Sequence, residues 1–333
     1  MRPNELDTFF EQLPGIRALV LGDVMIDRYS YVRHERMSPE APVPVWDVVH
    51  RESRPGGAGH VALNLQSLGC QVRLLGLAGQ DADGVVLRNL LNQQGLDDRY
   101  VVASPNRRTT LKHRIIADTT HLARLDEEDR FDANMAEEAQ LQQALLETID
   151  ETDVLILQDY NKGVLSAPII QFACMQAQSR GIPVAVDPKK QNFFAYRNVS
   201  LFKPNHKELC EAMGQQIPRN DVHGLMELMR ECRDRIGAES MLLTLSEEGI
   251  LYDRGDVRGH LPAGNLDVVD VSGAGDSVIS VAACALAAKL PMDTIAALSN
   301  LAGGLACTRS GVCSVALPEL KSAAQAIALP ENA

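Results

Sequence analysis

The sequence predicts an α/β protein in which helices cover both faces of a central, mostly parallel sheet. Residues 17–22 form an apolar run that does not alternate and ends in glycine, as expected of a strand buried on both faces. After Arg130, similar short runs alternate with segments of helical periodicity, which is the rhythm of βαβ units. No repeat, low-complexity tract or linker interrupts residues 1–333, so we expect one domain.

The composition restricts the class of protein and its surroundings. The chain is 45% hydrophobic and 23% charged, which is the balance of a globular protein. Its formal net charge of -12 opposes binding to nucleic acid or to an anionic membrane. No apolar run is long enough to span a bilayer, and no basic segment with an apolar core marks a signal peptide. Seven scattered cysteines without a C-x-x-C pair fit a reducing cytoplasm, the expected location.

Two pairs of residues near the N-terminus are candidates for ligand contacts. Asp23 and Asp27 directly follow the first strand, at the position where open α/β sheets bind ligands; turn and cap chemistry is the alternative. Gly56 and Gly57 precede a predicted helix over residues 61–68. Paired glycines let backbone N–H groups approach a ligand, but a tight turn explains this pair equally well.

Two segments do not fit the alternation of buried strands and helices. Residues 29–54 contain several prolines between short alternating pieces, and residues 109–125 alternate in the same way. Both predict strands of one small antiparallel sheet that stands off the main body. We interpret this sheet as a lid or a dimer surface.

The second half of the chain continues the regular alternation. Helices are expected over residues 134–149, 222–236, 277–290 and 292–308, buried strands over 153–157, 183–187 and 241–245, and an antiparallel hairpin over 249–261. Polar residues follow the strand ends, at Asp23, Asp159, Asp187, Asn205, Ser246 and Asp276. Because these ends share one edge of a doubly wound sheet, we expect the residues to converge on one cleft.

The segment from Asp270 to Asp276 has the composition of an anion site. Gly273 and Gly275 let the backbone approach an anion closely, and the following helix offers free N–H groups at its positive end. Asp276 lies where a carboxylate could take a proton from an attacking hydroxyl, which suits phosphoryl transfer. The alternative is an ordinary turn in which Asp276 only complements the helix dipole.

Three motifs together resemble a known family. Gly56-Gly57, Asn205-x-x-Glu208 and Gly273-Ala274-Gly275-Asp276 occur in the order and approximate spacing of the ribokinase-like sugar kinases, also called the phosphofructokinase-B type. The resemblance spans about residues 19–318. It implies the ribokinase-like fold and an enzyme that transfers a phosphoryl group from ATP to a sugar hydroxyl. A dehydrogenase is disfavoured because no G-x-G-x-x-G follows the first strand.

Four stretches are most similar to kinases that phosphorylate D-glycero-D-manno-heptose 7-phosphate at O1, on the route to the ADP-heptose of lipopolysaccharide. They are residues 22–29, 38–45, 159–165 and 187–189. One alternative is another kinase of the family that acts on a hexose, a hexose phosphate or a nucleoside. A second alternative is a catalytically silent regulator that binds a sugar phosphate.

The resemblance assigns roles on the nucleotide side of the site. Asp276 is the implied general base, and Gly273, Ala274 and Gly275 form the implied anion hole. Asn205 and Glu208 are implied to place Mg²⁺, largely through water, and the ATP phosphates. The implied nucleotide contacts are Thr244, Ser246, Gly249 and Asn300. Asp270 and Ser272 resemble a site for a monovalent cation such as K⁺.

On the sugar side, the resemblance implies contacts from polar groups and from cations. The implied hydroxyl and backbone contacts are Asp23, Asp27, Gly56, Gly57 and Asn64, and the candidate phosphate contacts are Arg124, Lys162 and Lys189. His60 stands where the family commonly has Asn, and Lys190 stands where the heptose kinases usually have Gly. Both departures fall on the presumed sugar side and bear on the identity of the substrate.

Two further expectations concern assembly. In relatives the lid pairs with a second copy, so a homodimer is expected through residues 29–54 and 109–125. The chain has the length of one kinase unit. We therefore expect a separate protein to supply the adenylyltransferase step that some bacteria fuse to the heptose kinase.

Overall fold

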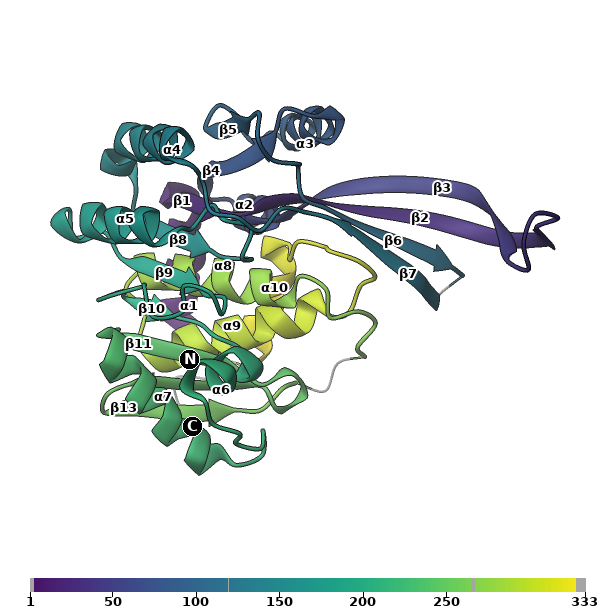
Figure 1. The fold of residues 1–333 in the computed structure, drawn as a ribbon. Coiled ribbons are helices and arrows are strands. Elements are labelled where there is room, and N and C mark those ends of the chain that lie inside the picture. Colours follow the sequence, from purple (N-terminus) through teal and green to yellow (C-terminus); the bar gives the residue numbers. More distant parts are fainter. Residues whose placement is uncertain (1–2, 119, 265–266, 328–333) are drawn as a thin grey trace.

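A nine-stranded sheet forms the centre of the molecule in a computed structural model that describes residues 3–118, 120–264 and 267–327 (Figure 1). The strand order is β13-β12-β11-β10-β9-β8-β1-β4-β5. Seven strands are parallel: β1 (Arg17–Gly22), β4 (Gln71–Gly79), β5 (Val101–Ser104), β8 (Val154–Gln158), β9 (Val184–Asp187), β10 (Leu201–Phe202) and β11 (Ser240–Thr244). The last two, β12 (Ile250–Arg254) and β13 (Val257–Leu261), form an antiparallel hairpin at one edge. The predicted α/β class is confirmed.

Helices cover both faces because successive side chains of each buried strand point to opposite sides. In β1, Ala18 and Val20 enter one core, whereas Leu19 and Leu21 enter the other. The first core is closed by α1 (Pro3–Gln12), α2 (Ala58–Ser67), α3 (Ala82–Gln93), α8 (Ala274–Ala287), α9 (Met292–Ala306) and α10 (Leu317–Ile327). The second is closed by α4 (Met135–Thr148), α5 (Ala167–Ser179), α6 (His206–Met213) and α7 (Val222–Ile236).

The order of the strands places a switch point at β1. This strand lies between β4, which follows it on one side, and β8, from which the sheet continues on the other side. Chain crossovers that leave β1 in opposite directions open a crevice at the carboxyl ends of the strands. Asp23 follows β1 and Asp159 follows β8, so both lie at this crevice.

A second sheet projects from the body and forms the lid (Figure 1). Its order is β3-β2-β6-β7, with β2 (Val24–Met37), β3 (Pro44–Gly57), β6 (Leu111–Ala117) and β7 (Thr120–Glu127). The predicted lid segments are therefore confirmed as strands. One detail differs from the antiparallel expectation, because β2 and β6 pair in parallel. Both strands leave the body in the same direction, since β6 arrives from the body and not through a hairpin.

The helix after the glycine motif begins earlier than the sequence pattern suggested. α8 starts at Ala274 and not near Ser277, so Asp276 lies in its first turn. Gly273 is the N-cap with φ of 80°, a left-handed conformation that favours glycine. Among the described residues, no helix is long and apolar enough to cross a membrane.

Candidate active site

Asp276 is a buried carboxylate with three hydrogen-bonding neighbours. Only 4% of the surface of Asp276 is exposed. Oδ2 lies 2.9 Å from Nδ1 of His60, on α2. Oδ1 accepts from the hydroxyl of Tyr160 at 2.6 Å and from Nε2 of Gln158 at 3.3 Å. Burial and then the charge of Asp276 raise the pKa of Tyr160, so its phenol stays protonated and donates. The carboxylate is therefore held in one orientation at the switch point of the sheet.

The glycine turn before Asp276 leaves the amino end of α8 open to an anion. Gly273 provides no side-chain cap; the Ala274 N–H donates to the Val271 carbonyl at 3.3 Å, and the N–H groups that follow in the first turn keep capacity to donate. A β-carbon at Gly275 would meet only Nζ of Lys203 and Oδ2 of Asp187, at 3.8 and 3.9 Å. Lys203 is 2% exposed and pairs with Asp187 at 3.1 Å. A buried cation thus lies beside the predicted anion hole, and the sequence analysis did not select it.

Asp23 organises the loop after β8. Its carboxylate accepts from the backbone N–H groups of Tyr160 at 2.7 Å, Lys162 at 3.0 Å and Val164 at 3.1 Å. Burial raises its pKa. Both oxygens are already used in this loop, which presents Tyr160 to Asp276. A contact from Asp23 to a sugar hydroxyl stays a prediction.

A second acid belongs to the same buried group. Asp159 accepts from the N–H of Asn161 at 2.7 Å and from the hydroxyl of Tyr196 at 2.9 Å. Burial, and next the charge of Asp23, raise the pKa of Asp159 to about 7. The carboxylates around this loop therefore bind a proton more readily than ordinary acids do.

Asp27 forms the next part of the crevice, at the root of the lid. It is 4% exposed and makes an ion pair with Arg114 of β6. A β-carbon at Gly56 would lie 2.1 Å from Oδ2 of Asp27, so only glycine leaves room for the carboxylate. Arg114 was missed by the sequence analysis. The available signal was its spacing of two from Lys112, which puts both cations on one face of a strand.

Cationic side chains surround Tyr160. Nζ of Lys112 lies 4.9 Å from the centroid of the Tyr160 ring, and Nζ of Lys189 lies 5.4 Å from it. Burial lowers the pKa of Lys112, and no described carboxylate is within ion-pair distance of its ammonium. Lys189 pairs with Glu208. Burial by itself lowers the pKa of Lys189, but the charges of Asp187 and Glu208 outweigh it, so the pKa is raised. The structure therefore brings Lys189 to the site and adds Lys112.

The other two predicted phosphate contacts lie differently. Nζ of Lys162 is 2.7 Å from Glu128, and its side chain is 12% exposed. Arg124 is on β7, pairs with Asp126 at 2.9 Å and is 57% exposed, although its strand position is opposite Arg114. Lys162 is therefore buried near the crevice, whereas Arg124 is exposed on the outer strand of the lid, on the same sheet face as Arg114.

The two departures from the family motifs have separate locations. The side chain of Lys190 is 72% exposed and lies 3.6 Å from Glu211 of α6, so it points to the surface. His60 is 1% exposed and contacts Asp276 directly. Asn64, a predicted sugar contact, lies behind His60 and bonds to it. Its role toward the sugar stays a prediction.

The predicted nucleotide residues follow the neighbouring strand ends. Asn205 and Glu208 form a capping box at the start of α6: the Glu208 N–H donates to Asn205 Oδ1 at 2.9 Å, and the Asn205 N–H donates to Glu208 at 2.8 Å. Asn205 also bridges to Thr244 at the end of β11. Ser246 and Gly249 follow with positive φ angles of 57° and 87°. The structure thus brings four of the predicted nucleotide residues into one region.

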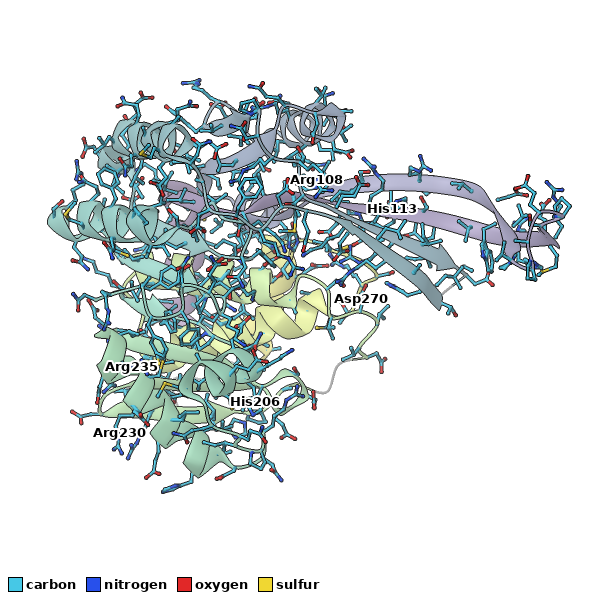
Figure 2. All side chains as sticks on the ribbon, viewed as in Figure 1. Arg108, His113, His206, Arg230, Arg235 and Asp270 are labelled. Carbon is cyan, nitrogen blue, oxygen red and sulfur yellow. The ribbon has the colours of Figure 1, made fainter. Side chains whose placement is uncertain are left out.

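The remaining predicted residues lie in loops around α8 and α9. Nδ2 of Asn300 donates to the Pro262 carbonyl at 2.8 Å. Asp270 accepts from the N–H groups of Ser272 at 2.9 Å and Gly311 at 2.8 Å, and joins two loops. Partial burial by itself raises the pKa of Asp270, but the hydrogen bonds from these N–H groups outweigh it, so the pKa is lowered. Figure 2 shows Asp270 before α8, on the side of the body from which the lid projects.

The donor set fits a water-rich magnesium site better than a metal cage. Among the described residues, no three His, Cys, Asp or Glu side chains gather at metal-binding distance. Glu208 offers one carboxylate beside the Asn205 amide, and both already make hydrogen bonds or ion pairs. Mg²⁺ keeps several waters and is bound through few carboxylates and substrate phosphates. The two residues are therefore compatible with contacts made through water.

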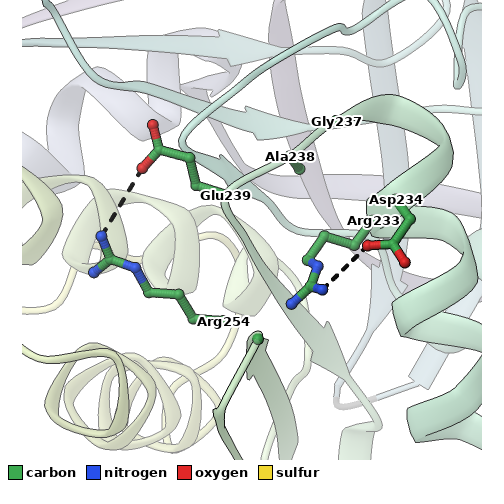
Figure 3. A pocket seen from close by; sticks show the side chains of 7 residues that line it. Arg233, Asp234, Gly237, Ala238, Glu239 and Arg254 are labelled. Carbon is green, nitrogen blue, oxygen red and sulfur yellow. Dashed lines mark hydrogen bonds and ion pairs between the residues drawn. The ribbon is translucent and has the colours of Figure 1, made fainter.

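An open pocket of about 480 Å³ lies elsewhere (Figure 3). It is lined by Arg233, Asp234, Gly237, Ala238, Glu239, Arg254 and Gly255. Its arginines already have acidic neighbours: Arg254 is 3.9 Å from Glu239, and Arg233 is 3.1 Å from Asp234. The loop from 237 to 239 precedes β11, so this pocket is at the amino edge of the sheet, opposite the edge that carries Asp276. It does not belong to the candidate site.

The fold is similar to solved structures of sugar kinases. Phosphofructokinase-2 from Escherichia coli in complex with potassium aligns with a TM-score of 0.76, over 92% of this chain and 97% of that chain, at 18% identity. A putative ribokinase from Agrobacterium tumefaciens aligns with a TM-score of 0.72, over 93% and 98%, at 17% identity. At this identity the likeness shows the fold alone, which is ribokinase-like.

Sequence comparison gives the class and then the family. The fold and the match together define a carbohydrate kinase, an enzyme class that uses ATP and Mg²⁺. Residues 16–320 match the family described as pfkB family carbohydrate kinase, and the chain belongs to this family.

Two curated relatives are both described as "Bifunctional protein HldE". The protein from Syntrophotalea carbinolica is 38% identical over 324 residues, which are 97% of this chain and 66% of the relative. The protein from Trichlorobacter lovleyi is 37% identical over 319 residues, which are 96% and 65%. This chain therefore spans about two thirds of the length of these relatives.

Proposed function

We propose that this carbohydrate kinase phosphorylates D-glycero-D-manno-heptose 7-phosphate at O1 and gives the 1,7-bisphosphate, a precursor of ADP-heptose. The four heptose-kinase-like stretches support this choice, and so does the similarity to bifunctional HldE proteins. The observation that carries it is a buried carboxylate, Asp276, bonded to Tyr160, whose ring lies beside Lys112 and Lys189; the charge of Lys162 also acts on Lys112. A sugar that already bears a phosphate needs such cations, because the protein as a whole is acidic.

In the proposed mechanism Asp276 accepts the proton from the O1 hydroxyl as it attacks the terminal phosphate of ATP. Both oxygens already accept hydrogen bonds; we assign acceptance to Oδ1, because it faces the Tyr160 loop and its bond to Gln158, at 3.3 Å, is the longest of the three. The open amino end of α8 and the buried Lys203 stabilise the charge on the phosphoryl group. Asn205 and Glu208 would hold Mg²⁺ through water, and the ion would supply positive charge to the ATP phosphates.

For the sugar phosphate we propose Lys112 as the principal contact, with Lys162 and Lys189 beside it. Lys112 has no carboxylate partner among the described residues, so a phosphate can approach it without breaking an ion pair. Lys162 and Lys189 must exchange Glu128 and Glu208 for the phosphate. Arg124 shares the sheet face of Arg114 but lies on the outer strand, so it reaches the substrate only if β7 moves over the crevice.

We also propose the assembly and the conditions expected from the sequence. Residues 1–333 act as one kinase unit in the cytoplasm, and the Asp270 and Ser272 loop binds a monovalent cation such as K⁺. Two copies pair through the lid. Apolar side chains on its outer strands support this pairing: Leu125 on β7 is 55% exposed, and Val49 on β3 is 63% exposed.

A substrate panel tests the proposal. Release of ADP is measured with the heptose 7-phosphate, the unphosphorylated heptose, fructose 6-phosphate, ribose and adenosine, with Asp276→Asn as the inactive control. Preference for the heptose 7-phosphate in kcat/KM supports the proposal. Preference for another acceptor identifies a different kinase of the family, and binding without turnover of any acceptor indicates a silent regulator.

A further inference from the structure

The histidine near the start of α2 touches the carboxylate on which the proposed mechanism depends. His60 is 1% exposed, and its Nδ1 is 2.9 Å from Oδ2 of Asp276. Tyr160 and Gln158 both bond to Oδ1, so His60 is the neighbour of the three that contacts Oδ2. The effect of this contact depends on which ring nitrogen carries the hydrogen.

The carboxylate of Asp276 determines the tautomer of His60, and Asn64 packs against the ring. The N–H of Val315 lies 3.2 Å from Oδ1 of Asn64, and because an N–H only donates, this side of the amide is the oxygen. The NH₂ group of Asn64 therefore faces the imidazole, with Nδ2 3.1 Å from Nε2 of His60. The same Nδ2 is 3.5 Å from Nδ1, so the amide lies over the ring and does not select the tautomer. Nδ1 carries the hydrogen because its partner at 2.9 Å, the carboxylate of Asp276, only accepts. Nδ1 then donates to Asp276.

The surroundings hold the ring in this position. A β-carbon at Gly273 would lie 2.7 Å from Cε1 of His60, so the turn that opens α8 packs directly on the ring. Ser277 donates to the oxygen of Asn64 at 3.0 Å, and Asn64 also donates to the His60 carbonyl at 3.0 Å. These bonds join α2 to the first turns of α8, which carry the glycine turn and the base.

We propose that His60 is a positioning residue for Asp276, an inference that rests on the proposed role of Asp276 as proton acceptor. The Nδ1–H of His60 holds Oδ2 and so keeps Oδ1 toward the acceptor hydroxyl of the sugar. Without this donor Tyr160 and Gln158 still hold Oδ1, but Oδ2 is no longer fixed and the carboxylate samples a wider range of orientations. Because His60 acts through Asp276 in this proposal, we expect its loss to lower kcat and to change KM little.

Two substitutions separate the hydrogen bond from the presence of a polar side chain. In His60→Asn the amide nitrogen can take the position of Nδ1 and donate to Asp276. In His60→Gln it reaches the position of Nε2 and leaves Oδ2 without this donor. We expect kcat to fall about tenfold to a hundredfold in His60→Gln and less than about threefold in His60→Asn, with KM for both substrates within about threefold of the parent.

Equal losses of kcat in the two variants, or a parental kcat in His60→Gln, overturn the proposal. His223→Gln, on the exposed side of α7, controls for a His-to-Gln change as such. A second measurement on the unmodified enzyme does not depend on folding of the variants. Imidazole ¹⁵N spectra, assigned by the signal lost in either His60 variant, should show His60 with hydrogen on Nδ1; hydrogen on Nε2 alone overturns the proposal.

Asp276→Asn in the same assays distinguishes the two levels of inference. If Asp276→Asn keeps its turnover, the role of Asp276 as proton acceptor fails, whatever the His60 variants do. If Asp276→Asn loses turnover and His60→Gln keeps a parental kcat, the proposed function stands and the positioning role alone fails.

Discussion

The side chains of the crevice around Asp276 are buried, whereas the outer strands of the lid sheet are largely exposed. Asp276, His60 and Asp23 are each at most 4% exposed, and every one of these side chains is hydrogen-bonded within the protein. Every residue of β7 is exposed. In β3, residues 47–51 are exposed, and only residues 55–57, next to the body, are buried. Under the proposed function, phosphoryl transfer depends on the buried part, and the pairing of two copies depends on the exposed part.

The largest effect on kcat is expected from a substitution in the buried part. Asp276→Asn keeps the shape of the side chain but removes the proton acceptor, so kcat should fall by about 10²- to 10⁴-fold, the usual range for loss of a general base. Steady-state kinetics and ATP binding by calorimetry measure the two consequences. ATP affinity should stay near that of the parent, and a loss of kcat below about tenfold contradicts the assigned role.

The next prediction concerns the cation at the junction of the two regions. Lys112→Met keeps the length of the side chain and removes its charge, so KM for the sugar phosphate should rise about tenfold or more, because charge-assisted hydrogen bonds are worth about 1.5–3 kcal/mol. KM for ATP should change little. Lys190→Met, at an exposed side chain, is the matched control. Equal effects of the two substitutions would remove Lys112 from the proposed phosphate site.

A third prediction concerns the lid alone. Leu125→Asp places a charge on the open face of β7, where a partner copy would have to bury it at a cost. Sedimentation should show a dimer for the parent and a weaker dimer or a monomer for the variant. Thermal stability of the body should be nearly unchanged, since the side chain is 55% exposed. A parent that is monomeric at all concentrations is inconsistent with pairing through the lid.

The smallest expected effect is the pH dependence of the buried acids. The pKa of Asp159 is raised to about 7, whereas an unfolded aspartate titrates near about 3.9. The folded state thus binds the proton more tightly, and the stability this provides is full below about pH 4 and lost as the pH rises through about 7. In Asp159→Asn the side chain at this position has no titratable group, so the variant serves as the reference.

Thermal melts at pH 5 and pH 8 and constant ionic strength measure this difference. The Tm of the parent relative to Asp159→Asn should fall by several degrees between the two pH values, since about 1 kcal/mol corresponds to a few degrees in a chain of this size. A difference in Tm that stays constant between pH 5 and pH 8 contradicts the raised pKa.

The sequence predicted the fold well because the necessary signals are local. Buried parallel strands are apolar throughout, and glycine at positive φ, as at Gly273, ends or begins an element wherever it falls. The parallel pairing of β2 with β6 was missed, because strand direction depends on the path of the chain between them. The start of α8 was placed three residues late, since Gly273 and Gly275 resembled a loop and not a first turn.

The sequence by itself determined the chemical groups of this kinase: a glycine turn with Asp276, an Asn-x-x-Glu pair and a lid, each recognisable from neighbouring residues. The tertiary structure decided which groups meet. It put His60 on Asp276, Lys112 on Tyr160 and Lys190 at the surface. Such contacts depend on the packing of α2 against α8, which joins residues 216 positions apart in the His60–Asp276 pair, and on the register of β6 with β2, which pairs residues such as Asp27 and Lys112. No local pattern in the chain encodes that register.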